Sequence, residues 1–169
     1  ILLSPYDPTV EKALAPLAKL RSGIATLSGN SLKTLVEPRW VDRLVVDAIH
    51  LDQLREHGGL AGLRDEHALE AALARPRQRW HYEPETPIPA LAAAYGFGLS
   101  RGHPYLDGNK RVSFVVLVVF LELNGLRFSA TETEVVEAMV ALAAGRMPEA
   151  ELAEWVAEHC GKPKRRGSA

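Results

Sequence analysis

The sequence has almost no cysteine, no excess of charge and no long hydrophobic run. Cys160 is the single cysteine among 169 residues, so an internal disulfide is excluded. The 20 basic residues nearly balance the 21 acidic ones, which leaves no overall field to attract nucleic acid or an anionic membrane. The most apolar stretch, 112–123, is shorter than the ~20 residues of a membrane helix. With no secretory pattern at its start, the chain is expected to be cytoplasmic and to bind neither nucleic acid nor a membrane.

Hydrophobic residues make up 47% of the chain, which is enough for the core of one compact domain. In segment 40–56, apolar residues recur at spacings of three and four, which predicts an amphipathic helix. Its expected apolar side comprises Val41, Leu44, Val45, Ala48, Ile49 and Leu54. Asp65 is expected to cap a second helix, which ends at the helix breaker Pro76. The polar, proline-containing stretch 77–89, with Trp80 and Tyr82, is interpreted as a functional loop or flap.

The second half of the chain also reads as helical. Pro89 suits the first turn of a helix that runs toward Arg101, in which closely spaced glycines indicate tight packing against other helices. The run 112–123 has the β-branched content of a strand, but its length with residues 109–111 favours a central buried helix. Thr131 and Glu134 form a capping box before a helix over 135–144, and Pro148 opens the last helix. The predicted fold class is therefore all-α, a helical bundle with a polar loop just before its central helix.

That polar loop, 103–111, carries the chemistry. It reads His103, Pro104, Tyr105, Leu106, Asp107, Gly108, Asn109, Lys110 and Arg111. A helix N-terminus presents free backbone amides and the positive end of the helix dipole, and it therefore binds phosphate. Lys110 and Arg111 add positive charge, Asp107 is a hard oxygen ligand for Mg²⁺, and His103 titrates in the range of a general base. The combination predicts phosphoryl or nucleotidyl transfer to a hydroxyl group.

The other histidines carry no comparable pattern. They are His50, His57, His67, His81 and His159, and none of them shares a ligand spacing with a cysteine pair. A zinc site is therefore not expected.

The loop resembles the signature of the Fic/Doc family, commonly written His-Pro-Phe-x-Asp-Gly-Asn-x-Arg. Lys110 stands where the Doc branch has lysine and Fic adenylyltransferases have glycine. The stretches 37–40 and 57–76 also resemble the opening of Doc toxins, so that the resemblance runs from about residue 37 to 159. Tyr105 departs from the family's phenylalanine, and its hydroxyl group is expected to need a hydrogen-bond partner.

The resemblance implies a role for each residue of the loop. His103 would act as the base, Asp107 would hold Mg²⁺, and Gly108 and Asn109 would shape the anion hole. Lys110 and Arg111 would bind the phosphates of ATP, and the lysine implies phosphorylation rather than adenylylation. The target known for Doc toxins is translation elongation factor Tu, whose modification arrests translation.

The segment before the domain resembles part of a different protein. Residues 2–8, Leu-Leu-Ser-Pro-Tyr-Asp-Pro, followed by a helical pattern, are similar to the C-terminal tail of AbrB-like antitoxins. The expected organisation is an antitoxin-like helical segment and linker over 1–36, a Fic/Doc domain over 37–160 and a basic disordered tail over 161–169. The antitoxin-like N-terminal segment would cover the active-site groove, either within one chain or across a swapped homodimer.

Three functional hypotheses remain at this point. The first is a kinase toxin of a toxin–antitoxin system, masked by its N-terminal segment. The second is a Fic-type adenylyltransferase. The third is a neutralised toxin–antitoxin module without catalytic activity, although the intact His103, Asp107 and Arg111 argue against a loss of chemistry.

Overall fold

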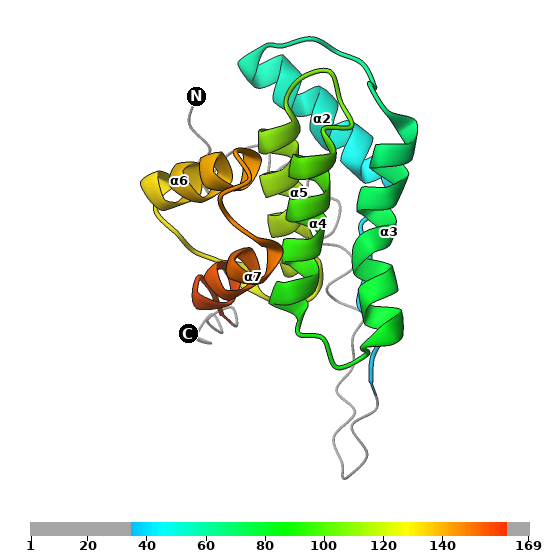
Figure 1. Ribbon diagram of the computed structural model, residues 1–169, viewed down its shortest axis with the longest axis vertical. Helices are drawn as coiled ribbons and strands as arrows, with labels where there is room; N and C mark the ends of the chain where they lie inside the picture. The colour runs from blue at the N-terminus through cyan, green and yellow to red at the C-terminus, as the bar shows by residue number, and fades with distance from the viewer. Residues whose placement is uncertain (1–34, 162–169) are drawn as a thin grey trace, which may run out of the picture.

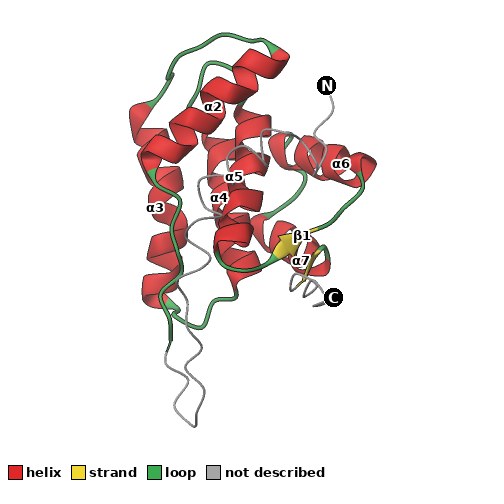
Figure 2. Ribbon diagram, turned by 180° about the vertical axis from the view of Figure 1, so that it is seen from behind, coloured by secondary structure: helices red, strands yellow, loops and turns green. Residues whose placement is uncertain are grey.

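The computed structural model describes residues 35–161, and most of this range is helical. The helices are α2 (Arg43–His57), α3 (Glu66–Tyr82), α4 (Ile88–Gly102), α5 (Asn109–Leu123), α6 (Glu132–Ala143) and α7 (Glu149–Glu158). Two short strands, β1 (Arg127–Phe128) and β2 (Cys160–Gly161), pair antiparallel (Figure 2). The predicted all-α class is confirmed. The predicted N-terminal helical segment and the basic tail lie outside the described residues, apart from the positions at their inner ends.

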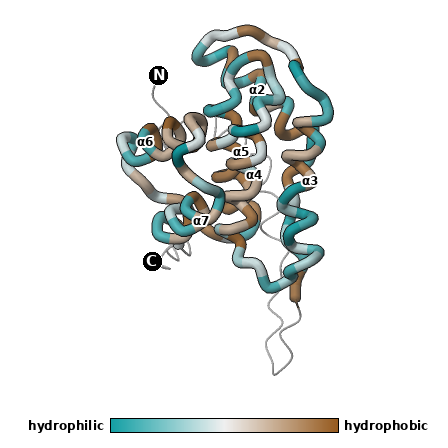
Figure 3. Tube along the Cα trace, in the orientation of Figure 1, coloured by the Kyte–Doolittle hydropathy of each residue, from teal (hydrophilic) through white to brown (hydrophobic). Residues whose placement is uncertain are grey.

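Helix α5 forms the centre of the bundle. Every residue from Val112 to Leu121 is buried, so the helix is surrounded by protein on all sides. Helix α4 packs along it, and the two occupy the middle of the molecule, with α3 on one side and α6 and α7 on the other (Figure 1). Hydrophobic positions concentrate on α4 and α5, whereas α3 is largely hydrophilic (Figure 3). The predicted central buried helix is confirmed, and its N-terminus lies at the end of the bundle where α2 ends.

Glycines in α4 allow its neighbours to approach closely. A Cβ atom on Gly98 would lie 3.0 Å from the Ala72 Cα of α3, and one on Gly96 would lie 2.9 Å from a Leu117 methyl group of α5. Both distances are shorter than an ordinary van der Waals contact. The prediction that these glycines serve tight helix packing is confirmed, and the packing fixes α4 against the helix that carries the site.

The apolar side predicted for α2 is partly wrong. Leu44 is 82% exposed and Ala48 is also exposed. The buried side is formed by Val46, Ile49, His50 and Gln53. These four positions also follow helical spacing, but two of them are polar, so hydrophobicity alone assigns the side incorrectly. The structure thereby places a buried histidine against the site.

The flap predicted over 77–89 is wrong as well. Helix α3 continues through Pro76 to Tyr82, and only 83–87 form a connection between helices. A proline inside a helix removes one backbone hydrogen bond. Packing offsets this loss, because the Trp80 ring meets Trp40 edge-on at 6.2 Å and Arg77 lies over the Trp40 ring. Trp80 therefore covers the edge of the core.

The remaining helix boundaries follow their sequence signals. Thr131 and Glu134 form the predicted capping box of α6. Pro89 lies in the first turn of α4, and Pro148 is the N-cap of α7. Within 35–161, no helix is both long and apolar enough to cross a membrane.

Candidate active site

The candidate site is the turn between the end of α4 and the start of α5. Helix α4 ends with His103 in the left-handed conformation, at φ 45° and ψ 53°. Helix α5 begins after Gly108, which is also left-handed, at φ 80°. Gly108 meets the condition under which glycine is strongly preferred, because side chains make this conformation unfavourable. The two left-handed residues, His103 and Gly108, flank a short loop that lies next to the N-terminus of α5.

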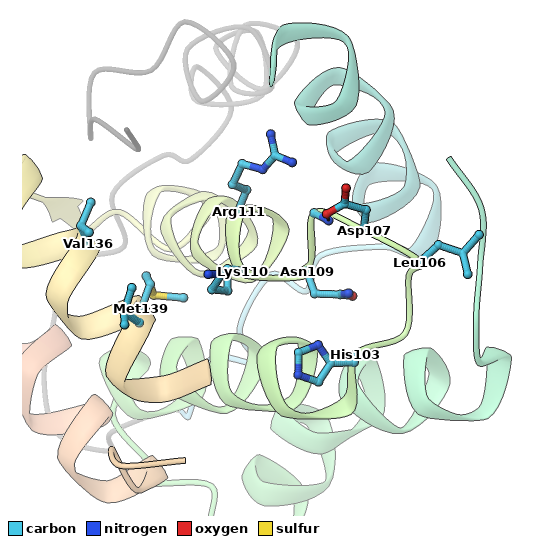
Figure 4. A pocket seen from close by; sticks show the side chains of 10 residues that line it. His103, Leu106, Asp107, Asn109, Lys110, Arg111, Val136 and Met139 are labelled. Carbon is cyan, nitrogen blue, oxygen red and sulfur yellow. The ribbon is translucent and has the colours of Figure 1, made fainter. Parts of the chain in front are cut away.

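His103 is the single residue other than glycine with positive φ in the described part of the chain. Such a conformation costs an ordinary residue about 1–3 kcal/mol and often marks a functional position. It lets the backbone turn away while the imidazole stays at the cavity wall (Figure 4). The fold thus keeps a histidine at a helix end where glycine would be less strained.

The loop is fixed from α5 by the side chain of Asn109. Its Oδ1 accepts a hydrogen bond from the Tyr105 amide at 2.9 Å, and its Nδ2 donates to the Tyr105 carbonyl at 2.8 Å. The side chain is buried, and both of its polar ends are satisfied by the backbone of one residue. The structure gives the Asn109 side chain a definite task beside the predicted one of shaping the anion hole: its amide holds the loop through the backbone of Tyr105.

The loop is also fixed from the α2–α3 connection. The Asp65 amide donates to the Pro104 carbonyl at 3.0 Å, and the Leu106 amide donates to the Gly62 carbonyl at 3.0 Å. Asp65 is at the same time the N-cap of α3, whose side chain accepts from the Ala68 amide as predicted. The start of α3 and the active-site loop are therefore held by one set of backbone bonds.

Tyr105 finds the partner that its hydroxyl group was expected to need. The hydroxyl donates to Asp47 Oδ1 of α2 at 2.7 Å, and Arg43 Nε donates to Asp47 Oδ2 at 2.8 Å. Arg43 also forms an ion pair with Glu66, the first residue of α3. The pKa of Tyr105 is raised far above its ordinary value, mainly by burial and secondly by the neighbouring Asp47, so the hydroxyl stays protonated.

His50 lies on the other side of the Tyr105 ring. The two rings are stacked, with centroids 3.8 Å apart and an interplanar angle of 13°. His50 Nε2 is 3.0 Å from the Asp107 carbonyl oxygen. Burial lowers the pKa of His50 below its ordinary value, which favours the neutral ring. No sequence pattern singles out this histidine, because its partners are a backbone carbonyl and an aromatic face.

The N-terminus of α5 forms an anion cradle. The amides of Asn109, Lys110 and Arg111 have no acceptor among the described residues, and no acidic residue lies in the first turn. Free amides and the helix dipole both favour an anion at this position. Two basic side chains in the first turn are unfavourable there unless an anion offsets them. The local electrostatics therefore favour a bound phosphate.

The two basic side chains differ in their surroundings. The Arg111 guanidinium lies against the end of α2, 3.5 Å from the Gln53 carbonyl oxygen and 3.3 Å from the Gly58 carbonyl oxygen. Both hydrogen bonds are long, so they hold the group weakly and compete little with a phosphate. Lys110 is exposed, and its ammonium group makes no hydrogen bond or ion pair with the described residues. The Lys110 ammonium group is therefore available to a ligand.

A cavity of about 550 Å³ opens over this cradle. Its walls comprise His103, Leu106, Asp107, Gly108, Asn109, Lys110, Arg111, Val136, Met139 and Val140. All six residues proposed from the sequence lie on this one cavity, with His103 at the end of α4 and Asp107 and Arg111 on the side of α2 (Figure 4). The sequence missed the apolar wall from α6, because the capping box locates that helix but not the neighbour it faces.

Asp107 is the residue available for a metal ion. Its side chain is exposed, and its Oδ1 accepts a 2.6 Å hydrogen bond from the Gly108 amide. No group of three or more His, Cys, Asp or Glu residues that could hold a metal occurs within 35–161. Mg²⁺ commonly binds one or two carboxylates and completes its shell with water and substrate phosphates. A single carboxylate beside an anion cradle fits this kind of binding, although no protein cage is present in the described residues.

Comparisons with known proteins agree with the resemblance given by the loop. Residues 40–121 match the model of the Fic/DOC family, a range that includes the whole cradle. Over 80 residues the chain is 34% identical to "Protein kinase doc" of Escherichia phage P1, which covers 47% of this chain and 64% of that protein. Over 74 residues it is 36% identical to "Toxin Doc" of Mycolicibacterium smegmatis, which covers 43% of this chain and 57% of that protein. The match thus spans less than two thirds of either relative.

Proposed function

We propose that this chain is a Doc-type member of the Fic/Doc family and the toxin of a toxin–antitoxin system, which transfers a phosphoryl group from ATP to a hydroxyl group of a protein. The observation that carries the proposal is the gathering of His103, Asp107 and the α5 cradle on one cavity. The name of the phage relative, a protein kinase, supports phosphorylation. The name of the mycobacterial relative supports a toxin.

The reaction assigns one task to each group. An acceptor hydroxyl loses its proton to the His103 imidazole while its oxygen attacks the γ-phosphorus of ATP. One oxygen–phosphorus bond forms and the bond to the leaving ADP breaks. The α5 amides, Lys110 and Arg111 stabilise the charge on the phosphate oxygens, as fixed donors do in other phosphoryl transfers. His103 then holds the proton that the hydroxyl gave up.

Asp107 would hold Mg²⁺, which when bound neutralises charge on the phosphates. The exposed carboxylate is positioned by the Gly108 amide and by the backbone of the loop. The apolar wall of Val136, Met139 and Val140 offers a surface for the uncharged part of a nucleotide. The ammonium group of Lys110, which makes no hydrogen bond or ion pair within the described residues, is the group expected to select the γ-phosphate.

The target and the partner come from the resemblance. The proposed protein substrate is elongation factor Tu, and the proposed consequence is arrest of translation. The proposed partner is an antitoxin, whose tail the segment 1–36 resembles. That segment would mask the cavity either in its own chain or in a second copy, and its structure lies outside the described residues.

Incubation with ATP labelled at the α or the γ position and with elongation factor Tu tests the proposal. The chain is compared with a version that lacks residues 1–34. Transfer of the γ label, stronger after truncation, supports a masked kinase. Transfer of the α label would establish an adenylyltransferase instead. No transfer by either version would support the module without catalytic activity.

A further inference from the structure

The contacts on the α2 side of the loop point to a role for a residue outside the sequence signature. His50 is buried, and a carbonyl oxygen only accepts hydrogen bonds. Its Nε2, 3.0 Å from the Asp107 carbonyl, must therefore carry the ring proton and donate it. This bond joins the middle of α2 to the residue that precedes the left-handed Gly108. It acts on the backbone at the point where the chain turns into α5.

The ring that makes this bond has neighbours on one face and at one edge. Tyr105 stacks on one face with centroids 3.8 Å apart, and the Gly108 backbone lies near its Cδ2 edge, where a Cβ atom on residue 108 would come within 3.7 Å. Tyr105 is itself anchored through its hydroxyl to Asp47, which is on the same helix as His50. Asp47 and His50 are separated by about one turn of α2. The helix therefore forms hydrogen bonds with the loop at two residues, Tyr105 and Asp107.

We propose that His50 is a positioning residue, which holds Asp107 in the orientation that binds Mg²⁺ by donating to its carbonyl while Tyr105 and Asp47 fix the imidazole ring. The inference rests on the proposed function, because it assigns Asp107 to the metal. A backbone bond is well suited to this task because it leaves both carboxylate oxygens of Asp107 outside the His50 contact. One of them accepts from the Gly108 amide, so a single peptide unit, that between Asp107 and Gly108, accepts from His50 through its carbonyl and donates to the Asp107 carboxylate through its N–H.

The anchor differs from that implied by the family signature. Where the signature has phenylalanine, which has only an aromatic face to offer, this chain has Tyr105 with a partner at 2.7 Å. Tyr105→Phe keeps the stack and removes the bond to Asp47. Asp47 would keep its bond to Arg43. The variant therefore tests the hydrogen bond between Tyr105 and Asp47 by itself, and it does not leave the charge of Asp47 without a partner.

Two measurements on the full chain test the proposal. The first is amide hydrogen exchange of segment 104–109, which reports the loop without any ligand. The second is the Mg²⁺ concentration that gives half-maximal ATP binding by calorimetry. His50→Phe retains a ring that can stack and loses the donor, whereas His50→Gln retains a donor. His81→Phe, at an exposed histidine whose ring contact is with Tyr82, is the matched control.

His50→Phe is expected to speed exchange of 104–109 by about fivefold, the effect of losing one hydrogen bond. It is expected to raise the Mg²⁺ requirement by about tenfold, as is usual for a residue that orients a metal ligand. His50→Gln should recover most of both effects, Tyr105→Phe should show smaller changes in the same direction, and His81→Phe should show none.

Unchanged exchange in both His50→Phe and Tyr105→Phe overturns the proposal, and so does a faster exchange with an unchanged Mg²⁺ requirement. If His50→Phe fails to fold, as a lost thermal transition would show, Tyr105→Phe and His50→Gln decide between the same outcomes. Absence of Mg²⁺-dependent ATP binding in both the full chain and the version that lacks residues 1–34 would refute the proposed function instead, and the exchange data would still show whether His50 holds the loop.

Discussion

The side chain of Asn109 is bonded to both the amide and the carbonyl of Tyr105, at 2.9 Å and 2.8 Å. One side chain thus closes the loop that carries Asp107 against the first turn of α5. Asn124, at the other end of the same helix, clamps Arg39 in the same way, at 2.9 Å and 3.0 Å. The two asparagines have matched bonds, but only the first one is next to the cavity.

This pair gives the first prediction. Asn109→Ala should lower the free energy of unfolding by about 2 kcal/mol, because it leaves two backbone groups of Tyr105 without partners. Asn124→Ala should lower it by a similar amount. Only Asn109→Ala should also weaken ATP binding, by about tenfold or more, because the loop loses its geometry. Urea unfolding and calorimetry measure the two effects. Equal loss of ATP binding in both variants would contradict the assigned role.

The second prediction concerns His103. His103→Ala should lower transfer to protein by at least about 100-fold, the range expected for a lost general base, and leave the fold intact. His103→Gly should lose activity equally but be more stable than the alanine variant by about 0.5–1 kcal/mol, because glycine tolerates the left-handed backbone at φ 45°. Label transfer and urea unfolding measure these effects. An alanine variant more stable than the glycine variant would show that the backbone is not strained.

The features of the fold that depend on neighbours in the chain could be predicted from the sequence, and those that depend on distant packing could not. The capping box of Thr131 and Glu134, the cap at Asp65 and the helix after Gly108 depend on neighbours in the chain, and all three are present. The prediction that a helix ends at Pro76 is wrong, because distant packing, which includes the contact between Trp80 and Trp40, retains the helix beyond the proline. A propensity says nothing of a contact across 40 residues.

The site shows the same division. The sequence predicted that His103, Asp107 and Arg111 share one site because all three lie within the nine consecutive residues 103–111. His50 escaped notice because its importance depends on which face of α2 meets the loop, and that face includes polar residues. The α6 wall escaped notice because Val136 and Met139 are ordinary apolar residues until a helix places them opposite the cradle.

The third prediction follows from the lowered pKa of His50, which burial causes. The folded protein favours the neutral ring, whereas an unfolded histidine titrates near pKa ~6.5. Between the lowered pKa and about 6.5 the unfolded chain binds more protons, so the free energy of unfolding falls as pH falls. The contribution is fully present above about pH 6.5. Urea unfolding near pH 7 and pH 5 should therefore show a larger loss in the unmodified chain than in His50→Gln.

The comparison with His50→Gln removes the contributions of other titrating groups. Asp47, Asp107 and Arg111 surround His50, and all three are retained in the variant. Equal losses of stability in the two proteins would show that His50 does not report the change in pH.

The last prediction concerns the choice between phosphoryl and nucleotidyl transfer. Lys110 is exposed on the cavity wall, and its ammonium group has no hydrogen bond or ion pair within the described residues, so its charge is available to a triphosphate. If it selects the γ-phosphate, Lys110→Gly should lower phosphorylation of the target by at least about tenfold and allow some adenylylation. Glycine in the first turn costs up to about 1 kcal/mol of helix stability, so Lys110→Ala serves as a second variant that separates charge from backbone effects.

Mass spectrometry of the target distinguishes an added phosphate from an added AMP. The unmodified chain should give the phosphate, Lys110→Ala should give less of it, and Lys110→Gly should give a mixture. An AMP adduct from the unmodified chain would refute the kinase assignment, and full phosphorylation by both variants would show that the amides and Arg111 orient the nucleotide without the lysine.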